Sequence, residues 1–447
     1  MLYTNKDLKR LIIPLVFEQL LAILVGMVDT VMIAGVGEAA VSGVSLVDTI
    51  NILVINITAA LSTGGAVVTG HFLGQKDTEN ASKSAWQLVL FSVCLSLIVT
   101  VLFLGAHGPL LRIVFGQVEP EVMSNASVYL VITALSICPL AIYNACAALF
   151  RAMSDSKTTM YIAIAMNLIN LVGNAILIYG AKIGVAGAAI ATTLSRIVAA
   201  VIIMYLMFHS DRVINFRGQV TWKINGRIIK KILYIGIPNS LENSLFQLGK
   251  ILLLSLISTF GTYSIAANAV CNTLAGFNIL PGQAINMALL SVASMCIGAG
   301  DFNQARYYTK KLIRIAIGCV GAISAILFVF APWILKIYQL TPQTESLAIQ
   351  VLRYHTVLAV IFWVPSFTLP NTLRAAGDVV WTMIIAASSM WIFRIGFAYV
   401  FSGYFNGGLL GVWVAMTIDW AFRTLCYGMR YHRNKWERYA DSGRAGT

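Results

Sequence analysis

Charged residues are scarce in this chain, and acidic residues are the scarcest of them. Only 11% of the 447 residues are charged, with 18 Asp and Glu against 31 Lys and Arg, while 58% are hydrophobic. A soluble domain needs more charge than this to cover its surface, and the mean hydropathy of +0.80 agrees with that argument. The composition therefore excludes an ordinary soluble protein and indicates a membrane protein.

Common catalytic and nucleotide-binding motifs are also missing. The sequence contains no H-E-x-x-H, no G-x-x-x-x-G-K-[ST] and no G-x-S-x-G, so neither a metalloprotease nor an ATP-driven pump is supported. Seven cysteines lie in apolar segments without paired spacing, which argues against a disulfide framework and against a metal site. We therefore expect no enzymatic activity, no metal centre and no cofactor.

Long apolar runs recur along the chain, each able to cross a hydrocarbon core of about 30 Å. Twelve spans are predicted, which makes the fold class an all-α polytopic membrane protein. They lie at 11–35, 46–70, 86–106, 128–150, 160–180, 184–208, 229–259, 265–296, 312–331, 347–373, 381–402 and 409–429. The polar connector 209–228 separates an N-terminal part, 1–208, from a C-terminal part, 229–430, and 431–447 forms a tail.

The basic residues gather on one side of these spans. Of the 31 Lys and Arg, 23 lie at the two ends of the chain and in alternate loops, whereas the opposite loops contain only Arg112, Lys182 and Lys336. The positive-inside rule then places both termini in the cytoplasm of a multi-pass protein in the cell membrane. Because topology explains the net charge of +13, no nucleic-acid partner is expected.

The two halves of the sequence repeat each other. Pro14 and Glu18 recur as Pro238 and Glu242, both 224 residues later. The other repeated stretches are GQKD at 74–77 with GAGD at 298–301, LFRAMSD at 149–155 with TLRAAGD at 372–378, and GVAGAAIATTLSR at 184–196 with GVWVAMTIDWAFR at 411–423. Six spans, a connector and six more spans in the same orientation predict two six-helix lobes related by a parallel repeat. That architecture suits alternating access around a central site.

Asp29 is the carboxylate that least suits its surroundings. It lies in LAILVGMVDTVMIAG, about 27 Å of helix beyond Leu11, and its repeat equivalent is Leu253. The scaffold therefore does not require an acid at this position. We interpret Asp29 as a group that exchanges between its neutral and charged forms when a cation approaches. The alternative is a helix-packing hydrogen bond, or a helix end that reaches water.

Several motifs together resemble the MATE (multidrug and toxic compound extrusion) family of cation-coupled exporters. They are MVDTVMIAG at 27–35, the RAMSD and RAAGD loops, NAILIYG at 174–180 and GVAGAAIAT at 184–192, and the resemblance covers essentially the whole chain. It implies a V-shaped central cavity between two lobes. It also implies an antiporter that exports amphiphilic, often cationic, small molecules, driven by entry of H+ or Na+.

The same resemblance assigns three neutral partners to Asp29, namely Asn170, Asn174 and Thr192. Positions 170 and 174 share one helix face, so both amides can point at one site. Many family members carry a second acid where this chain has Asn174, so only one carboxylate remains here. We favour a proton as the coupling ion and leave a single Na+ open. Asparagines that only hold transmembrane helices together are the alternative.

Lys250 and Arg394 lie well inside apolar spans of the second half. Three interpretations remain open: a pair with an acid, for which Glu242 and Asp29 are the nearest candidates, contact with an anionic group of the substrate, or snorkelling. Substrate contact would weaken the expectation of a cationic substrate. The full set of substrate-cavity candidates is Glu18, Glu242, Gln247, Lys250, Arg394 and Met27, where Gln247 occupies the place of an acid in some family members.

Other acids are predicted to have structural roles. Glu18 and Glu242 occur in both halves, which favours a structural role shared by the two lobes over substrate contact. Three acid–base pairs have the spacing of four residues that allows a local ion pair. They are Arg151 with Asp155, Arg374 with Asp378, and Asp419 with Arg423.

Two other functions remain open. Related two-lobe transporters flip lipid-linked anionic precursors, and Lys250 with Arg394 could hold a pyrophosphate, although such proteins commonly have more than twelve spans. A membrane receptor would bind its ligand without gradient-driven flux. In each case the expected partners are a small molecule and the lipid bilayer, and we expect a monomer.

Overall fold

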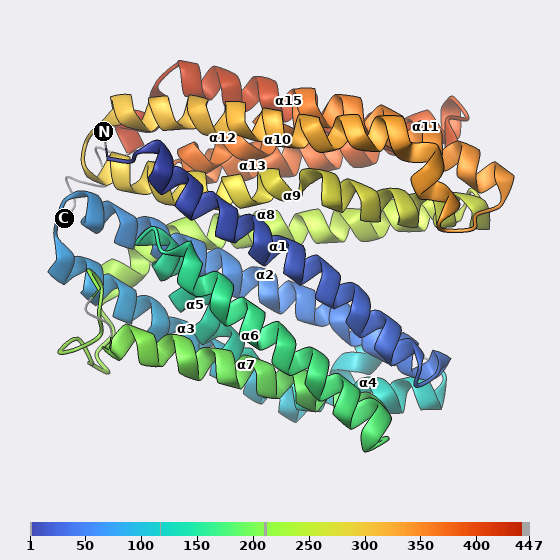
Figure 1. Cartoon of the computed structure of the whole chain (residues 1–447), viewed down its shortest axis with the longest axis horizontal. Coiled ribbons are helices and arrows are strands. Elements are labelled where there is room, and N and C mark those ends of the chain that lie inside the picture. Colours follow the sequence, from blue (N-terminus) through green and yellow to red (C-terminus); the bar gives the residue numbers. More distant parts are fainter. Residues whose placement is uncertain (1, 117, 210–211, 440–447) are drawn as a thin grey trace. The chain divides into compact units, whose positions relative to one another are not determined.

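The computed structural model describes residues 2–116, 118–209 and 212–439. These residues are mostly helical and contain no strand (Figure 1). They form two compact units, one from Asn5 to Ser240 and one from Leu241 onward that also includes the short segment ending at Thr4. We call these the N-terminal lobe and the C-terminal lobe. The boundary lies inside α8 (Gly226–Ser258), so the connector and the first part of this helix belong to the N-terminal lobe.

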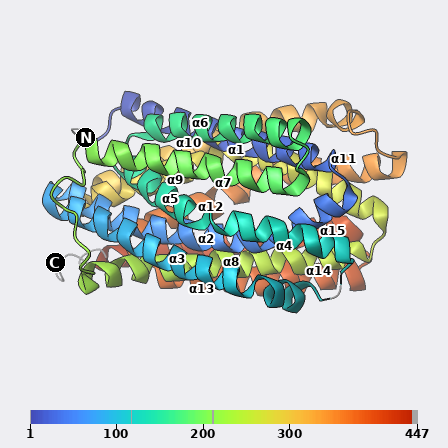
Figure 2. The ribbon, with the colours of Figure 1, turned by 90° about the horizontal axis from the view of Figure 1, so that it is seen from below.

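Long apolar helices build the N-terminal lobe, which runs from blue to green in Figure 1. They are α1 (Asn5–Ala34), α2 (Glu38–Gly74), α3 (Thr78–Phe115), α4 (Pro120–Ala134), α5 (Ile137–Ala152), α6 (Ser156–Asn174) and α7 (Gly184–His209). Helices α6 and α7 lie side by side in both views, and α1 packs along α6 (Figures 1 and 2). Directly after Asn174, α6 continues into a π-helical turn, η1 (Ala175–Gly180). Such turns occur frequently at functional sites.

The C-terminal lobe contains the second part of α8 and the helices that follow it. They are α9 (Thr262–Gly298), α10 (Phe302–Lys336), α11 (Pro342–Leu358), α12 (Val364–Ala375), α13 (Val379–Ser389), α14 (Phe397–Tyr399) and α15 (Gly408–His432). π-Helical segments interrupt this lobe at η2 (Ala359–Trp363), η3 (Met390–Gly396) and η4 (Val400–Tyr404). One of them, η3, carries Arg394.

The helices agree with the predicted all-α membrane fold. Ten helices in the described parts of the chain are long and apolar enough to cross a membrane, or eleven when α4 and α5, bent by 49°, count as one broken span. The remaining predicted span, 229–259, corresponds to α8. This helix has 33 residues but is not among those ten or eleven, because Asn, Gln, Glu and Lys residues lower its hydropathy.

Two repeated aspartates cap equivalent helices of the two lobes. Asp77 accepts a hydrogen bond from the Asn80 N–H at 3.0 Å before α3, and Asp301 accepts one from the Gln304 N–H at 2.9 Å before α10. These backbone N–H groups hold the pKa of both carboxyls below its usual range. The recurrence of GQKD as GAGD is therefore explained by helix capping.

A second repeated contact is an ion pair between a glutamate and an arginine inside each lobe. Arg151 lies 3.3 Å from Glu18 in the N-terminal lobe. Arg374 donates to both carboxylate oxygens of Glu242, at 2.7 and 2.8 Å, in the C-terminal lobe. The glutamates and their arginines recur with nearly the same offset, so both lobes retain the pair. This geometry agrees with a shared structural role for Glu18 and Glu242.

The predicted local pairs of Arg151 with Asp155 and of Arg374 with Asp378 are wrong. Asp155 instead pairs with Arg212, and Asp378 pairs with Arg430. Each aspartate follows a sharp turn, at Ser154 (φ 63°) and Gly377 (φ 85°) respectively. The turn carries the carboxylate past the end of the preceding helix and toward the start of the next one, away from the arginine four residues earlier.

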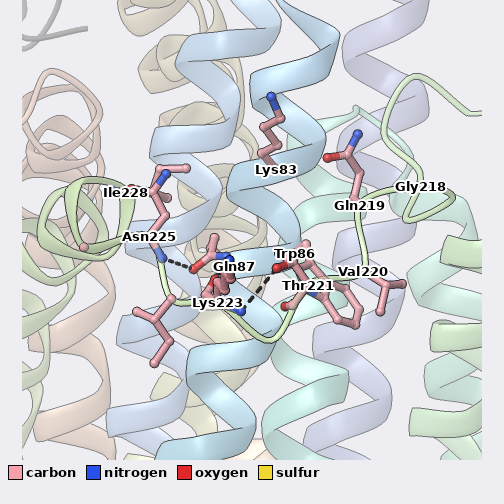
Figure 3. A pocket seen from close by; sticks show the side chains of 12 residues that line it. Lys83, Trp86, Gln87, Gly218, Gln219, Val220, Thr221, Lys223, Asn225 and Ile228 are labelled. Atoms are coloured by element: carbon pink, nitrogen blue, oxygen red, sulfur yellow. Dashed lines mark hydrogen bonds between the residues drawn. The ribbon is translucent and has the colours of Figure 1, made fainter.

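Hydrogen bonds join residues 221–225 of the polar connector to α3 (Figure 3). Trp86 Nε1 donates to the Thr221 carbonyl at 2.8 Å, and Gln87 Nε2 donates to the Lys223 carbonyl at 2.9 Å. The Asn225 N–H donates to Gln87 Oε1 at 2.8 Å. Because Gln87 is only 4% exposed, these bonds are shielded from water. Residues 221–225 of the predicted connector are thus packed on the N-terminal lobe.

Gly64 on α2 allows the backbone of α8 to approach closely. A Cβ atom at Gly64 would lie 2.5 Å from the Ile232 carbonyl oxygen, whereas a Cβ at Gly105 on α3 would meet nothing within 4 Å. We expect Gly64→Ala to lower the free energy of unfolding by about 1–3 kcal/mol through overpacking. Gly105→Ala should leave it unchanged or raise it by up to about 1 kcal/mol through helix propensity. Thermal unfolding of the two purified variants checks this, and equal shifts would contradict it.

Candidate functional site

Asp29 on α1 faces two asparagines of α6. Asn174 Nδ2 donates to Asp29 Oδ1 at 2.8 Å. With its amide nitrogen toward Asp29, Asn170 donates to both carboxylate oxygens at 2.9 and 3.0 Å and accepts from Thr192 Oγ1 at 3.1 Å. The opposite orientation of this amide would direct a carbonyl oxygen at a carboxylate, which is unfavourable. The four residues predicted for cation coupling therefore lie together in one hydrogen-bonded cluster of the N-terminal lobe.

This cluster is shielded on the side of α6 and accessible on the side of α1. Asn170 and Asn174 are 6% and 2% exposed, while Asp29 and Thr192 are half-buried. Within the described residues, Asn174 Oδ1 has no hydrogen-bond partner. A buried acceptor without a partner is unusual and costs free energy. Together with the carboxylate, it adds an oxygen atom that a bound cation can use.

Two further charged residues influence Asp29 and were not among the predicted site residues. Asp48 on α2 and Arg196 on α7 both interact electrostatically with it. Asp48 also forms a side-chain hydrogen bond with Tyr129, and Arg196 donates to Ser136 Oγ at 2.7 Å. The sequence alone could have identified both residues. Each lies inside a predicted span, where an ionisable group is a functional candidate by default.

A cavity of about 680 Å³ lies inside the C-terminal lobe. Its lining contains two cations, Lys250 and Arg394, and no acidic residue among the described positions. Much of its wall consists of five large aromatic side chains: Phe246, Trp363, Phe367, Trp413 and Trp420. Its planar apolar walls and positive charge distinguish this cavity from the hydrogen-bonded cluster around Asp29.

Arg394 pairs with Asp419, which the sequence predicted to pair with Arg423 alone. Arg394 Nε lies 2.9 Å from Asp419 Oδ2, and Arg423 Nε lies 2.8 Å from Asp419 Oδ1. The predicted pair of Asp419 with Arg423 is confirmed. The suggested pairing of Arg394 with Glu242 is wrong, because η3 packs against α15 and brings Arg394 to Asp419, while Glu242 binds Arg374.

The other substrate-cavity candidates lie in different surroundings. Gln247 is half-buried on α8 and is not part of the cavity lining. Met27 on α1 is 44% exposed. Glu18 and Glu242 are engaged in the repeated ion pairs. Of the six candidates, the structure therefore brings only Lys250 and Arg394 into one cavity.

His355 on α11 is a member of the cavity wall that sequence reasoning missed. It is 3% exposed, and its ring contacts Trp413 and Trp420 edge-on, with centroid distances of 5.2 and 5.7 Å. In the described part of the chain, neither ring nitrogen has a hydrogen-bond partner. A histidine inside the predicted span 347–373 was the available signal.

Comparison with known proteins finds relatives that match this chain over nearly its whole length. The chain is 26% identical over 440 residues to the probable multidrug resistance protein NorM of Thermotoga maritima, covering 98% of this chain and 94% of that protein. It is 25% identical over 428 residues to the uncharacterized transporter YisQ of Bacillus subtilis, covering 95% and 93%. A crystal structure of MATE in complex with MaD3S shares the fold with a TM-score of 0.90 and 23% identity, covering 97% of this chain and 96% of that one.

The family profile matches both halves of the chain. The MatE profile aligns with residues 14–176 and again with 238–400. The two matches begin 224 residues apart, which is the offset of the Pro14 and Glu18 repeat, and together they cover well over half of the sequence. The two-lobe all-α membrane fold is thereby confirmed, and the chain belongs to the MatE family.

Proposed function

We propose that this protein is a secondary active antiporter that exports amphiphilic small molecules, coupled to the entry of H+ or Na+ at Asp29. One observation carries the proposal: the Asp29 carboxylate, inside the first span, receives hydrogen bonds from the Asn170 and Asn174 amides. The name of the Thermotoga maritima relative supports multidrug efflux as the kind of transport. Cytoplasmic termini and alternating access between the two lobes belong to the same proposal.

The cluster links the charge of Asp29 to the packing of α1 on α6. The two amides stabilise the carboxylate form, because hydrogen bonds to a charged acceptor are stronger than bonds to a neutral one. A proton on Asp29 removes that charge and weakens both bonds. A Na+ ion requires oxygen ligands, so the amides would have to turn their carbonyl oxygens toward it. Either ion therefore changes the contacts between the two helices, which can bias a conformational equilibrium.

Transport by the purified full chain in proteoliposomes tests this function. An inward pH gradient and an inward Na+ gradient are imposed separately, and efflux of a fluorescent amphiphilic dye is followed. We expect one gradient to drive efflux against the dye concentration and the other to have little effect, which identifies the ion. Dye binding without gradient-driven flux would indicate a receptor and overturn the proposal.

The positive cavity favours a second candidate function. An exporter or flippase of an anionic or lipid-linked substrate would use Lys250 and Arg394 to hold a carboxylate or pyrophosphate group. The same liposomes distinguish it, because a lipid-linked pyrophosphate would change leaflets while the amphiphilic dye would remain inside.

A further inference from the structure

We propose that the cavity of the C-terminal lobe binds an aromatic organic anion, with Lys250 as the charged contact for the anionic group. The cavity thereby selects the charge of the ligand. Transport of this ligand rests on the proposed export function, whereas binding does not depend on it.

Positive charge exceeds negative charge around one phenyl ring of the cavity. Lys250 Nζ and the Arg394 guanidinium each lie 5.0 Å from the centroid of Phe246, and the Arg423 guanidinium lies 5.8 Å from it. Asp419 is the acid that pairs with the two arginines. Glu242 also interacts with Arg423, but it is paired with Arg374. Four cations and two carboxylates therefore lie in this region, which leaves an excess of two positive charges inside a membrane-spanning lobe.

Lys250 is the cation that a ligand can reach. Arg394 and Arg423 are 4% and 2% exposed and are held by Asp419. Lys250 is exposed and lines the cavity, and no acid pairs with it among the described residues. Uncompensated charge inside a membrane protein is costly. An anionic group beside Lys250 would remove part of that cost, whereas a cationic group would add repulsion.

The walls of the cavity suit a planar apolar body. The Trp363 and Phe367 rings are stacked, 5.1 Å apart at an interplanar angle of 21°, and both line the cavity. Aromatic faces of this kind hold flat ring systems by stacking. The charge at Lys250 and the stacked rings together define an amphiphile with a flat ring system and a negative head.

Two buried polar groups without partners also belong to the wall. Both His355 ring nitrogens and Asn286 Oδ1 lack hydrogen-bond partners in the described residues, and both side chains line the cavity. Buried polar atoms are nearly always paired, so these atoms are available to polar substituents of a ligand. They are independent of Lys250 and also indicate a binding site.

Two probes of similar size and opposite charge test the proposal: 2-naphthalenesulfonate and trimethyl-(2-naphthyl)ammonium. The full-length protein in lipid nanodiscs is titrated with each, and the fluorescence of the cavity tryptophans is followed. We expect the sulfonate to bind at least about tenfold more tightly than the ammonium probe. Lys250→Gln should weaken sulfonate binding at least about tenfold, and Lys250→Arg should retain it.

Lys311 provides a matched control in the same lobe. Its Nζ lies 5.2 Å from the Tyr307 ring, a geometry like that of Lys250 on Phe246, but it is outside the cavity. Lys311→Gln should leave sulfonate binding unchanged. Equal or tighter binding of the ammonium probe to the wild-type protein would overturn the proposal, even if Lys250→Gln failed to fold. Equal weakening by both glutamine variants would overturn it as well.

The proposed anion site and the proposed export function can be overturned independently. Titration is performed without any ion gradient, so a lack of gradient-driven flux in proteoliposomes would overturn the proposed antiport and leave the sulfonate preference intact. Conversely, gradient-driven export of cationic dyes with no sulfonate preference in binding would overturn the anion site alone.

Discussion

Replacement of Asp29 by Asn is expected to abolish gradient-driven export while the protein still inserts and folds. The amide has nearly the same shape as the carboxylate, but it can neither gain a proton nor attract a cation by charge. Asn170 and Asn174 cannot substitute, because amides carry no net charge. Flux in proteoliposomes under the driving gradient should therefore fall to the level of protein-free liposomes.

Glu38→Gln is a suitable control for this variant. Glu38 is an exposed acid in the first turn of α2, outside the cluster, and its amide variant should transport like the wild-type protein. Asn174→Ala should reduce flux without abolishing it, because the carboxylate remains and only one of its hydrogen bonds is lost. Undiminished gradient-driven flux in Asp29→Asn would disprove the role assigned to this carboxylate.

The second large effect is expected for Asp419→Asn, and it concerns stability. Asp419 is fully buried and lies within 2.9 Å of one arginine and 2.8 Å of another. Its replacement leaves Arg394 and Arg423 buried without their shared countercharge. Removing one partner of a buried ion pair typically costs about 3–5 kcal/mol. Thermal unfolding of the purified protein should show a correspondingly large loss of stability.

Glu437→Gln provides the comparison for an accessible ion pair. Glu437 pairs with Arg306, and the side chains are 24% and 32% exposed, so water can solvate the arginine after the change. The expected loss is about 0–1 kcal/mol. Equal shifts for Asp419→Asn and Glu437→Gln would show that the buried charges are compensated in another way.

The helices and the internal repeat could be predicted because both depend on local patterns in the sequence. Apolar runs determine where helices can cross a bilayer, and a repeated lobe leaves repeated residues such as Pro14 and Pro238. The unusual position of Asp29 could be recognised for the same reason, because a carboxylate within an apolar run is visible in the sequence. Its partners Asn170, Asn174 and Thr192 came from family resemblance. In the structure both asparagines contact Asp29, and Thr192 contacts Asn170.

Ion-pair partners were less predictable, because a side chain's direction depends on the local turn and on the packing of distant helices. Spacing alone suggested that Arg151 binds Asp155, but the turn at Ser154 separates them and Arg151 binds Glu18 from α1. Spacing succeeded for Asp419 and Arg423, which lie on one uninterrupted helix. It gave no indication that the same acid also binds Arg394, about 25 residues away in sequence.

By itself, the sequence determined that this chain is a two-lobe, all-α membrane protein with Asp29 isolated in an apolar stretch of its first span. Those features follow from hydrophobic length, repeated residues and the cost of charge in a bilayer. Only the tertiary structure decided which cations are neutralised, because Arg394 and Lys250 have similar surroundings in sequence and different partners in space. Packing of η3 on α15 brings Arg394 to Asp419. Lys250 is left facing an aromatic cavity that has no acid among the described residues of its lining.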